Sequence, residues 1–208
     1  MKLLNQYTSR TVPGYLEVSG LVLGNNTITV NSSAPWRKGE FFRKELTVAN
    51  GSVPVWQSIS VAAPGETTVS GNVFVPKTPE AFTYDADGNL TQDGRWDYTW
   101  DAENRLVKLE SRSGAPNGSK RKLEFAYDWR GRRIGKKVTN LDTSTVLSEE
   151  KFLYDGWNLI AKLNSSFALV QSYLWGLDLS GSMQGAGGVG GLLAVTDVSA
   201  GSHFASCF

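Results

Sequence analysis

The sequence predicts an all-β protein made of repeated antiparallel β-hairpins, and three observations support this fold class. The 208 residues include 22 glycines and 11% aromatic residues, and these residue types favour turns and pleated strands respectively. Short apolar or β-branched runs are separated by Asn-Gly and Asp-Gly pairs, which favour the left-handed conformations of tight hairpin turns. The turn signals recur roughly every 8–12 residues, a spacing typical of antiparallel all-β proteins.

The predicted strands follow one another along the chain, and no Ala/Leu/Glu/Lys-rich window of helical length separates them. Two prolines, Pro76 and Pro79, divide the series, because a proline cannot donate a ladder hydrogen bond. Before them the strands are rich in β-branched residues, and after them the chain becomes aromatic, charged and repetitive. The strands are expected at 27–30, 41–48, 53–62, 67–75, 80–84, 96–100, 105–109, 122–127, 133–139, 146–154, 158–163 and 167–175.

Composition excludes several kinds of site. The chain has one cysteine, Cys207, and one histidine, His203. It therefore cannot form an intramolecular disulfide, and it cannot complete a structural zinc site of about four nitrogen or sulfur ligands. A nucleophile–histidine triad would depend on His203, close to the end of the sequence. We expect no cofactor, no metal and no enzymatic activity.

Charge and hydropathy give no sign of a membrane or nucleic-acid partner. The net charge is +1, which predicts no global attraction to nucleic acid or to an anionic membrane surface. No apolar run approaches the ~18 residues that a membrane-spanning helix needs. The segment Met1–Gln6 has only two apolar residues after its lysine, so it does not read as a secretory signal.

A repeated motif is the strongest signal in the sequence. Four segments each have an aromatic residue, an aspartate, a turn with Gly or Asn, and an aliphatic residue. Their aromatic residues are at positions 84, 100, 127 and 154, which are 16, 27 and 27 residues apart. The carboxylate is expected to accept backbone N–H groups two residues on, and Gly or Asn to take the positive-φ position. The motif residues are Tyr84, Asp85, Gly88 and Asn89; Trp100, Asp101 and Asn104; Tyr127, Asp128 and Gly131; and Tyr154, Asp155 and Asn158.

These segments resemble the YD repeats of Rhs (rearrangement hot spot) proteins. Residues 84–90 are similar to the basic unit, and residues 96–106 to the most typical repeat of that family. A second stretch resembles the segment that leads into the Rhs-associated core region, on the residues Trp175, Gly176, Asp178, Gly181, Gln184, Gly185, Gly187, Gly188, Gly190 and Gly191. The resemblance implies three parts: a β-rich lead-in at 1–76, YD-repeat hairpins at 77–172, and an incomplete start of the core region at 173–208.

The resemblance also implies a role. In this family a curved ribbon of hairpins forms a β-shell that often encloses a C-terminal toxin domain, which is delivered to another cell or displayed at the surface. This chain is then expected to be a non-enzymatic section of such a shell, secreted or at the cell surface. Its partners would be the remainder of a longer shell or an enclosed toxin domain. Family members are usually far longer, and the Asp-Pro-x-Gly elements that end the core are absent, so we expect a fragment or a truncated member.

Two further motifs have simpler explanations than a ligand site. Residues 185–190 match Gly-x-Gly-x-x-Gly, but a dinucleotide site also needs a following helix and an acid about 20 residues on. Asp85, Asp87 and Asn89 alternate as calcium ligands do, but Leu90 and Trp96 stand where a calcium loop needs Gly and Glu. We interpret both segments as turns, with incidental calcium binding as an alternative for the second.

Charge is unevenly distributed along the repeats. Residues 80–104 hold seven acids and one base, a net charge of −6, whereas residues 105–137 hold eleven bases and three acids, a net charge of +8. Bases interleaved with aromatic residues can bind nucleic acid, and Arg132 and Arg133 are the residues to test for that alternative. The favoured interpretation is that adjacent strands carry complementary charges.

The acids and tryptophans leave two further hypotheses open. Asp97, Asp101 and Glu103 would be the candidates for a glycosidase-like acid pair, but strand and turn roles explain them equally well. The tryptophans exceed what a core of this size needs, and a minority of them could stack on sugars. A carbohydrate- or cell-surface-binding module, with glycans as partners, is therefore the alternative function. The seven are Trp36, Trp56, Trp96, Trp100, Trp129, Trp157 and Trp175.

Overall fold

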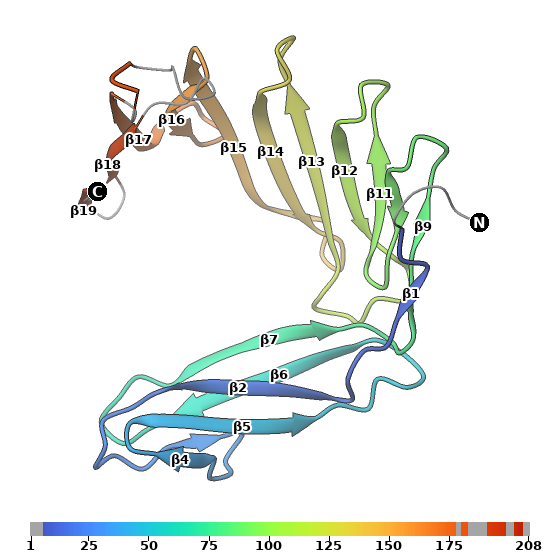
Figure 1. Ribbon diagram of the computed structural model, residues 1–208, viewed down its shortest axis with the longest axis vertical. Helices are drawn as coiled ribbons and strands as arrows, with labels where there is room; N and C mark the ends of the chain where they lie inside the picture. Colours follow the sequence, from blue (N-terminus) through green and yellow to red (C-terminus); the bar gives the residue numbers. More distant parts are fainter. Residues whose placement is uncertain (1–5, 178–179, 183–190, 199–201, 206–208) are drawn as a thin grey trace. The chain divides into compact units, whose positions relative to one another are not determined.

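The computed structural model describes residues 6–177, 180–182, 191–198 and 202–205, and throughout these ranges the chain forms strands and no helix. Every strand pair is antiparallel, and most join neighbours in the sequence (Figure 1). The predicted fold class, all-β with repeated antiparallel hairpins, is therefore confirmed. Among the described residues, none belongs to a helix that could cross a membrane.

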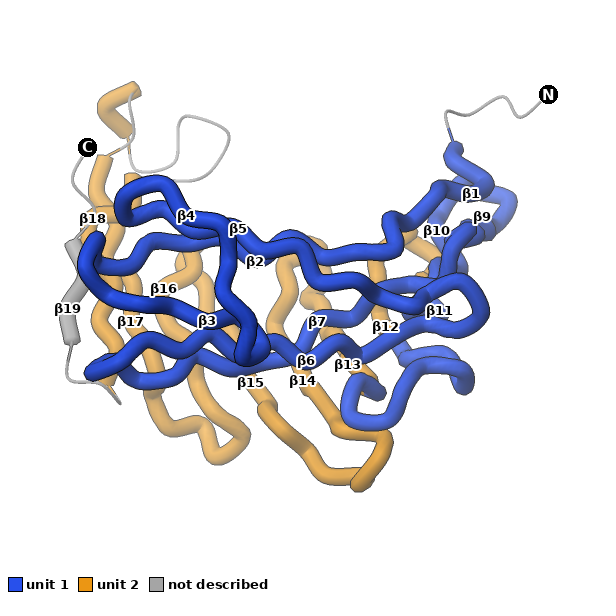
Figure 2. The backbone as a smooth tube through the Cα atoms, turned by 90° about the horizontal axis from the view of Figure 1, so that it is seen from below, with its two compact units in different colours: residues 1–98, 110–120 blue, residues 99–109, 121–208 orange. Residues whose placement is uncertain are grey.

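The chain divides into two compact units. Unit 1 comprises residues 1–98 and 110–120, and unit 2 comprises residues 99–109 and 121–208 (Figure 2). Strands β11 (Trp96–Trp100) and β12 (Leu106–Ser111) contribute residues to both units. The three-part division drawn from the sequence stays a prediction.

Unit 1 contains two three-stranded sheets and a short two-stranded one. One sheet has the order β2-β5-β4, another β3-β6-β7, and β1 pairs with β8. Strands β9 (Thr83–Tyr84) and β10 (Leu90–Gln92) then begin the repeats. The bounds of the first eight strands are β1 Ser9–Arg10, β2 Tyr15–Leu21, β3 Thr29–Val30, β4 Trp36–Lys38, β5 Phe41–Thr47, β6 Val55–Ala62, β7 Val69–Val75 and β8 Glu80–Ala81.

The core of unit 1 is small. Ile28, Val30 and Phe42 are buried, with partly buried aliphatic residues from β2, β5 and β6 packed against them. Exposure along β2 alternates with each residue, so every second side chain faces this core. Gly20 is one of these inward positions, and an added Cβ there would lie 2.8 Å from the Phe42 ring. Glycine at this position therefore makes room for the phenylalanine.

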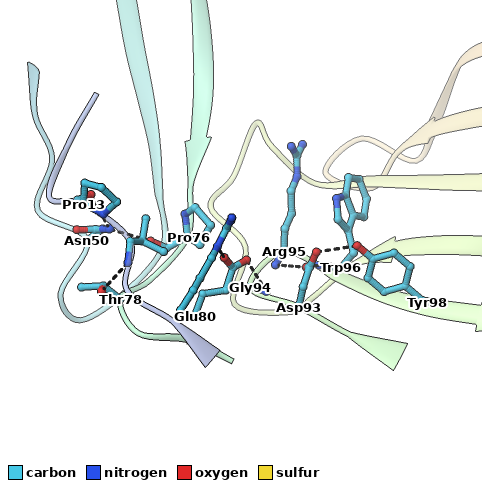
Figure 3. A network of polar contacts seen from close by, with 12 residues as sticks. Pro13, Asn50, Pro76, Thr78, Glu80, Asp93, Gly94, Arg95, Trp96 and Tyr98 are labelled. Atoms are coloured by element: carbon cyan, nitrogen blue, oxygen red, sulfur yellow. Dashed lines mark hydrogen bonds and ion pairs between the residues drawn. The ribbon is translucent and has the colours of Figure 1, made fainter. Parts of the chain in front are cut away.

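A polar network organises the segment that follows β7 (Figure 3). Glu80 is almost fully buried, and its carboxylate accepts hydrogen bonds from Arg10 Nε at 2.5 Å and from the Gly94 N–H at 3.1 Å. Asn50 is buried as well, and its Nδ2 donates to the carbonyl oxygens of Pro13 (3.3 Å) and Pro76 (2.9 Å). These bonds satisfy buried polar groups that would otherwise destabilise the fold.

Asp93 extends the network toward β11. Its Oδ1 accepts the N–H groups of Arg95 and Trp96 at 2.7 and 2.6 Å, and its Oδ2 accepts the Tyr98 hydroxyl at 2.7 Å (Figure 3). Burial, the Asp93 hydrogen bond and the nearby negative charges together raise the pKa of Tyr98 well above its ordinary value of 10. The Arg95 guanidinium lies 4.6 Å from the centroid of the Trp96 ring, in cation–π contact.

Unit 2 is a series of hairpins in chain order, from β13 to β19. Successive strands pair antiparallel, as in the register that places Lys137 opposite both Glu124 and Glu149. Bulges interrupt the pairing near several strand ends, including Ala126/Tyr127 and Leu153/Tyr154. The bounds are β13 Arg121–Tyr127, β14 Arg133–Asn140, β15 Thr145–Asp155, β16 Asn158–Leu163, β17 Leu169–Gly176, β18 Gly191–Asp197 and β19 Ser202–Ala205.

Charges on these strands pair across the sheet of unit 2. Glu150 lies between two lysines, 3.6 Å from Lys136 Nζ and 3.4 Å from Lys162 Nζ. Lys151 pairs with Glu149 at 2.8 Å within β15. Complementary charges on adjacent strands, the favoured interpretation, are thus seen where Glu150 pairs with Lys136 and Lys162, whereas Lys151 and Glu149 pair within one strand.

The core of unit 1 predicts that truncating two adjacent phenylalanines to alanine lowers the free energy of unfolding by very different amounts. Phe42 is 4% exposed and faces the core, whereas Phe41 is 40% exposed on the other side of β5. Phe42→Ala should lower the free energy of unfolding by about 3–5 kcal/mol, the cost of a cavity left by a buried ring. Phe41→Ala, the control, should cost only about 1 kcal/mol, because it loses one edge-to-face contact with Trp36. Urea unfolding followed by circular dichroism measures both, and equal losses would contradict this assignment of the core.

Candidate functional site

The repeats reverse direction in turns that share one backbone geometry, here called corners: residues 85–89, 101–105, 128–132 and 164–168. In each, the N–H of the first residue donates to the carbonyl of the fifth at 3.0 Å, and the N–H of the fourth donates back to the carbonyl of the first at 3.0–3.3 Å. The fourth residue has a positive φ of 92°, 58°, 78° and 62° respectively. Those fourth residues are Gly88, Asn104, Gly131 and Phe167.

The side chain of the first residue closes each corner. Its Oδ1 accepts the N–H of the fifth residue at 2.8–3.0 Å. At Asp101, Asp128 and Asn164 it also accepts the N–H of the third residue at 2.9–3.0 Å. One oxygen atom therefore satisfies two backbone donors that the reversal of the chain would leave without partners.

These hydrogen bonds set the charge state of the corner aspartates. At Asp101 the N–H of Arg105 has the largest effect on the pKa, and with the Arg105 side chain it holds the pKa below the ordinary value of 3.8. At Asp85 and Asp128 burial pushes the pKa upward, but the hydrogen bonds outweigh it and the pKa is again lowered. The corner carboxylates are therefore held as anions.

Two arginines and two tyrosines of unit 2 connect successive corners. Together with the aspartates Asp101 and Asp128 they are here called the corner ladder: Arg105, Arg132, Tyr127 and Tyr154. In two corners the fifth residue is an arginine that pairs with the aspartate at the first position of the same corner. Arg105 Nε lies 2.8 Å from Asp101, and Arg132 Nη2 lies 2.6 Å from Asp128. The same arginines reach the following turn, which is the corner 128–132 for Arg105 and the tighter turn at 155–158, also called a corner, for Arg132. Arg105 Nη1 donates to the Asp128 carbonyl at 3.3 Å, and Arg132 Nη1 donates to the Gly156 carbonyl.

Two tyrosines of the corner ladder contact the preceding hairpin, whereas the arginines contact the following one. Tyr127 lies beneath the Arg105 guanidinium at 5.3 Å and donates its hydroxyl to the Leu106 carbonyl at 2.9 Å. Tyr154 repeats this arrangement beneath Arg132 at 5.1 Å, and its hydroxyl donates to the Arg133 carbonyl at 3.0 Å. Tyr127 and Tyr154 thus bind the hairpin before them, as Arg105 and Arg132 bind the hairpin after them.

The structure places the predicted motif residues at strand ends and turns. Tyr84, Trp100, Tyr127 and Tyr154 are at or next to the ends of β9, β11, β13 and β15, and the aspartates follow them. The corner after β15 is tighter, because Asp155 pairs directly with Asn158 and Gly156 has a φ of 55°. In the segment that leads into the core region, Trp175 and Gly176 end β17, Gly191 begins β18, and Gly181 has a φ of 75°. Asp178, Gln184, Gly185, Gly187, Gly188 and Gly190 lie outside the described residues.

Sequence reasoning missed two parts of this arrangement. The arginines of the corner ladder were counted as basic charge, although the spacing Asp-x-x-x-Arg occurs at both 101–105 and 128–132. The corner at 164–168 was also missed, because it begins with Asn164 and places Phe167 at the positive-φ position. The signal available for it was an asparagine followed by two serines between two apolar runs.

The three acids considered for a glycosidase-like pair each have a structural partner. Asp101 is held in its corner, Glu103 pairs with Arg105 at 2.8 Å, and Asp97 accepts a hydrogen bond from Gln92 Nε2 at 2.7 Å. Among the described residues, no group of three or more His, Cys, Asp or Glu side chains could hold a metal ion. Chemically, the site consists of charge-assisted hydrogen bonds to backbone groups.

Comparisons with known proteins give partial similarity. No protein-family model matches the chain. It is 31% identical over 107 residues to the tRNA nuclease WapA of Bacillus subtilis (strain 168) and, to the same extent, to the tRNA3(Ser)-specific nuclease WapA of Bacillus spizizenii. Each match covers 50% of this chain but 4% of the relative, so the chain spans only a small part of the length of these proteins. Among solved structures, the crystal structure of TcdB2-TccC3 matches with a TM-score of 0.41 and 15% identity, over 88% of this chain and 9% of that chain.

The corner ladder predicts that two arginines of the corner 128–132 contribute differently to the stability of unit 2. Arg132→Ala removes the ion pair to Asp128, the bond to the Gly156 carbonyl and the contact with Tyr154. Arg130→Ala, the matched control, removes only a guanidinium that lies over the exposed Trp129 ring. The first change should lower the thermal midpoint and speed amide hydrogen exchange in β15 and β16, and the second should do neither. Equal exchange rates in the two variants would show that the ladder does not stabilise unit 2.

The lowered pKa values of Asp101 and Asp128 predict an acid-sensitive stability. Because the folded-state pKa lies below the unfolded-state value near 3.8, the stabilisation is complete above that value. It is lost as the pH falls through the lower folded-state pKa. Urea midpoints measured between about pH 2 and pH 6 should therefore fall at the acid end, and the double change Asp101→Asn, Asp128→Asn should flatten this limb. Asp87→Asn, which removes a carboxylate outside the corner bonds, should leave the profile unchanged.

Proposed function

We propose that this chain is a non-enzymatic structural section of an Rhs/YD-repeat shell. The observation that carries the proposal is the corner ladder. Its arginines and tyrosines bind backbone carbonyls of the neighbouring hairpin, so their chemistry is used to join one repeat to the next. A repeat that binds only its neighbours along the chain is the unit from which extended walls are built.

The side chains that could supply chemistry are committed to this structural role. The corner aspartates are held as anions by N–H groups and arginines, which is the wrong state for a general acid. Glu149 and Glu150 are paired with lysines. This pattern supports a wall in which carboxylates organise turns and strands, and it favours a non-enzymatic section.

The proposed partners follow from the family resemblance and from the similarity to the WapA proteins. The names of those relatives describe nucleases, and the matched region is 4% of their length. We assign to this chain a part of the wall that accompanies such a toxin activity. Its partners would then be the remainder of a longer shell or an enclosed toxin domain, in a secreted or cell-surface protein.

Immunoprecipitation from the cells that make this chain, followed by native gel electrophoresis and peptide mass spectrometry, tests the proposal. A wall section should be recovered in a larger assembly that contains further aromatic-Asp repeats, covalently or as a partner. The purified 208-residue chain should release no fragments from total tRNA. A free monomer in the cell, or tRNA cleavage that a point substitution in this chain abolishes, would contradict the proposal.

Exposed tryptophans favour a second candidate function, binding of cell-surface glycans. Trp129 is 83% exposed and Trp157 is 48% exposed, and they lie on adjacent corners that the Arg132–Gly156 bond joins. Neither indole takes part in the corner bonds, and large exposed aromatic surfaces suit stacking on sugar rings. A saturable tryptophan-fluorescence response to a glycan, lost in Trp129→Ala but kept in Trp36→Ala, would favour this function over a purely structural one.

A further inference from the structure

The two three-stranded sheets of unit 1 have four edge strands, and three of them resist pairing with another chain. β3 has only two residues, β4 has three with two bases, Arg37 and Lys38, and β2 carries Glu17, which is paired with Arg43. Shortness and charge are the features by which native edge strands avoid unwanted partners. β7, which pairs only with β6 in its sheet (Figure 1), has neither feature. It is seven residues long, uncharged and free of proline, and five of its residues are exposed.

The exposed valines of β7 lie on the side of the strand that faces the core. Val69, Val73 and Val75 share one face, because side chains alternate along a strand. Val75 is buried, yet Val69 is 69% exposed and Val73 is 40% exposed. Val69 is also directly opposite Val61, which packs against the buried cluster. The apolar face of this sheet therefore continues past the point where the chain covers it.

A groove begins at the same place. It has a volume of about 620 Å³, and its walls come from β2, β5, β6 and the start of β7. Val18, Phe42, Val61 and Val69 are among its mainly apolar lining residues. The ionisable residues that line it are both acids, Glu40 and Glu66. The groove therefore suits apolar side chains accompanied by a positive charge.

We propose that β7 accepts an added β-strand from an extended peptide segment with alternating apolar side chains and a basic residue beside them. The peptide backbone would hydrogen-bond to the free edge of β7, which supplies affinity that does not depend on sequence. Every second side chain would cover Val69 and Val73 and enter the groove. A lysine or arginine of the segment would face Glu40 and Glu66. This site lies in unit 1, so it stands independently of the proposed role of the corner ladder.

The synthetic peptide acetyl-Lys-Val-Thr-Val-Thr-Val-Lys-amide is the probe, titrated into the full chain and followed by amide chemical-shift changes. We expect saturable shifts in β7 and around the groove, with a dissociation constant of about 10 μM to 1 mM, as suits a short strand. The control peptide has the same sequence with the backbone nitrogens of all three valines and both threonines methylated, so it keeps the side chains and the charge but those residues have no N–H to donate on either edge. It should cause no saturable shift.

Two protein variants with the same added charge locate the site. Val73→Lys places a positive charge on the covered face and should weaken binding about tenfold or more. Ser70→Lys places it on the opposite face of β7 and should change the affinity less than about threefold. Glu66→Gln should weaken binding and reduce its salt dependence. Circular dichroism of each variant checks that the strands are intact.

Several results would overturn the proposal. Equal binding of the N-methylated peptide would show an apolar groove without strand addition. No saturable shift by about 1 mM would show that the edge does not accept a strand. A dimer of the free protein that Val73→Lys converts to a monomer would identify a second copy of this chain as the occupant. Each of these outcomes contradicts the occupant stated here.

Discussion

The acceptance of two backbone N–H groups by one side-chain oxygen is the interaction on which the repeats depend. A strand that reverses direction leaves N–H groups without ladder partners, and such groups are costly when water is excluded. In three corners the Oδ1 atom of the first residue accepts these N–H groups, and the positive φ of the fourth residue brings the donors into reach. The first residues are Asp101, Asp128 and Asn164. The same solution with Asp and with Asn shows that oxygen placement, more than charge, builds the turn.

Charge then connects one turn to the next. An aspartate held as an anion can pair with an arginine four residues on, and the planar guanidinium has further donors for a second partner. Arg105 and Arg132 use these donors on carbonyls of the following corner, with a tyrosine ring beneath them. Local turn chemistry and contact between hairpins therefore share the same atoms. Because the same side chains close a turn and join two hairpins, they support a structural role for the repeats. The edge of β7 in unit 1 is the separate place where we propose that a partner strand binds.

Much of the fold was predictable because it rests on short-range chemistry. Strand positions followed from alternating runs between Asn-Gly and Asp-Gly turns. All 12 expected ranges overlap strands, and ten of them overlap strands longer than two residues. The corner at 164–168 was not predictable in this way, since a phenylalanine rarely adopts a positive φ and Asn164 stands in the place of the motif's aspartate. Arg105 and Arg132 were misjudged for a related reason: a base count says nothing about which carbonyl a guanidinium reaches.

The sequence by itself determined the class of fold, the repeating motif and the aspartates that close three of the corners, because all of these depend on groups within five positions of one another. Tertiary structure alone decided which hairpin each arginine and tyrosine binds, which glutamate each lysine pairs with, and which tryptophans stay exposed. It also decided that β7 has an uncovered apolar face beside an acidic-rimmed groove. These features depend on strand register and on packing between distant segments, and a pattern of residue types does not specify either one.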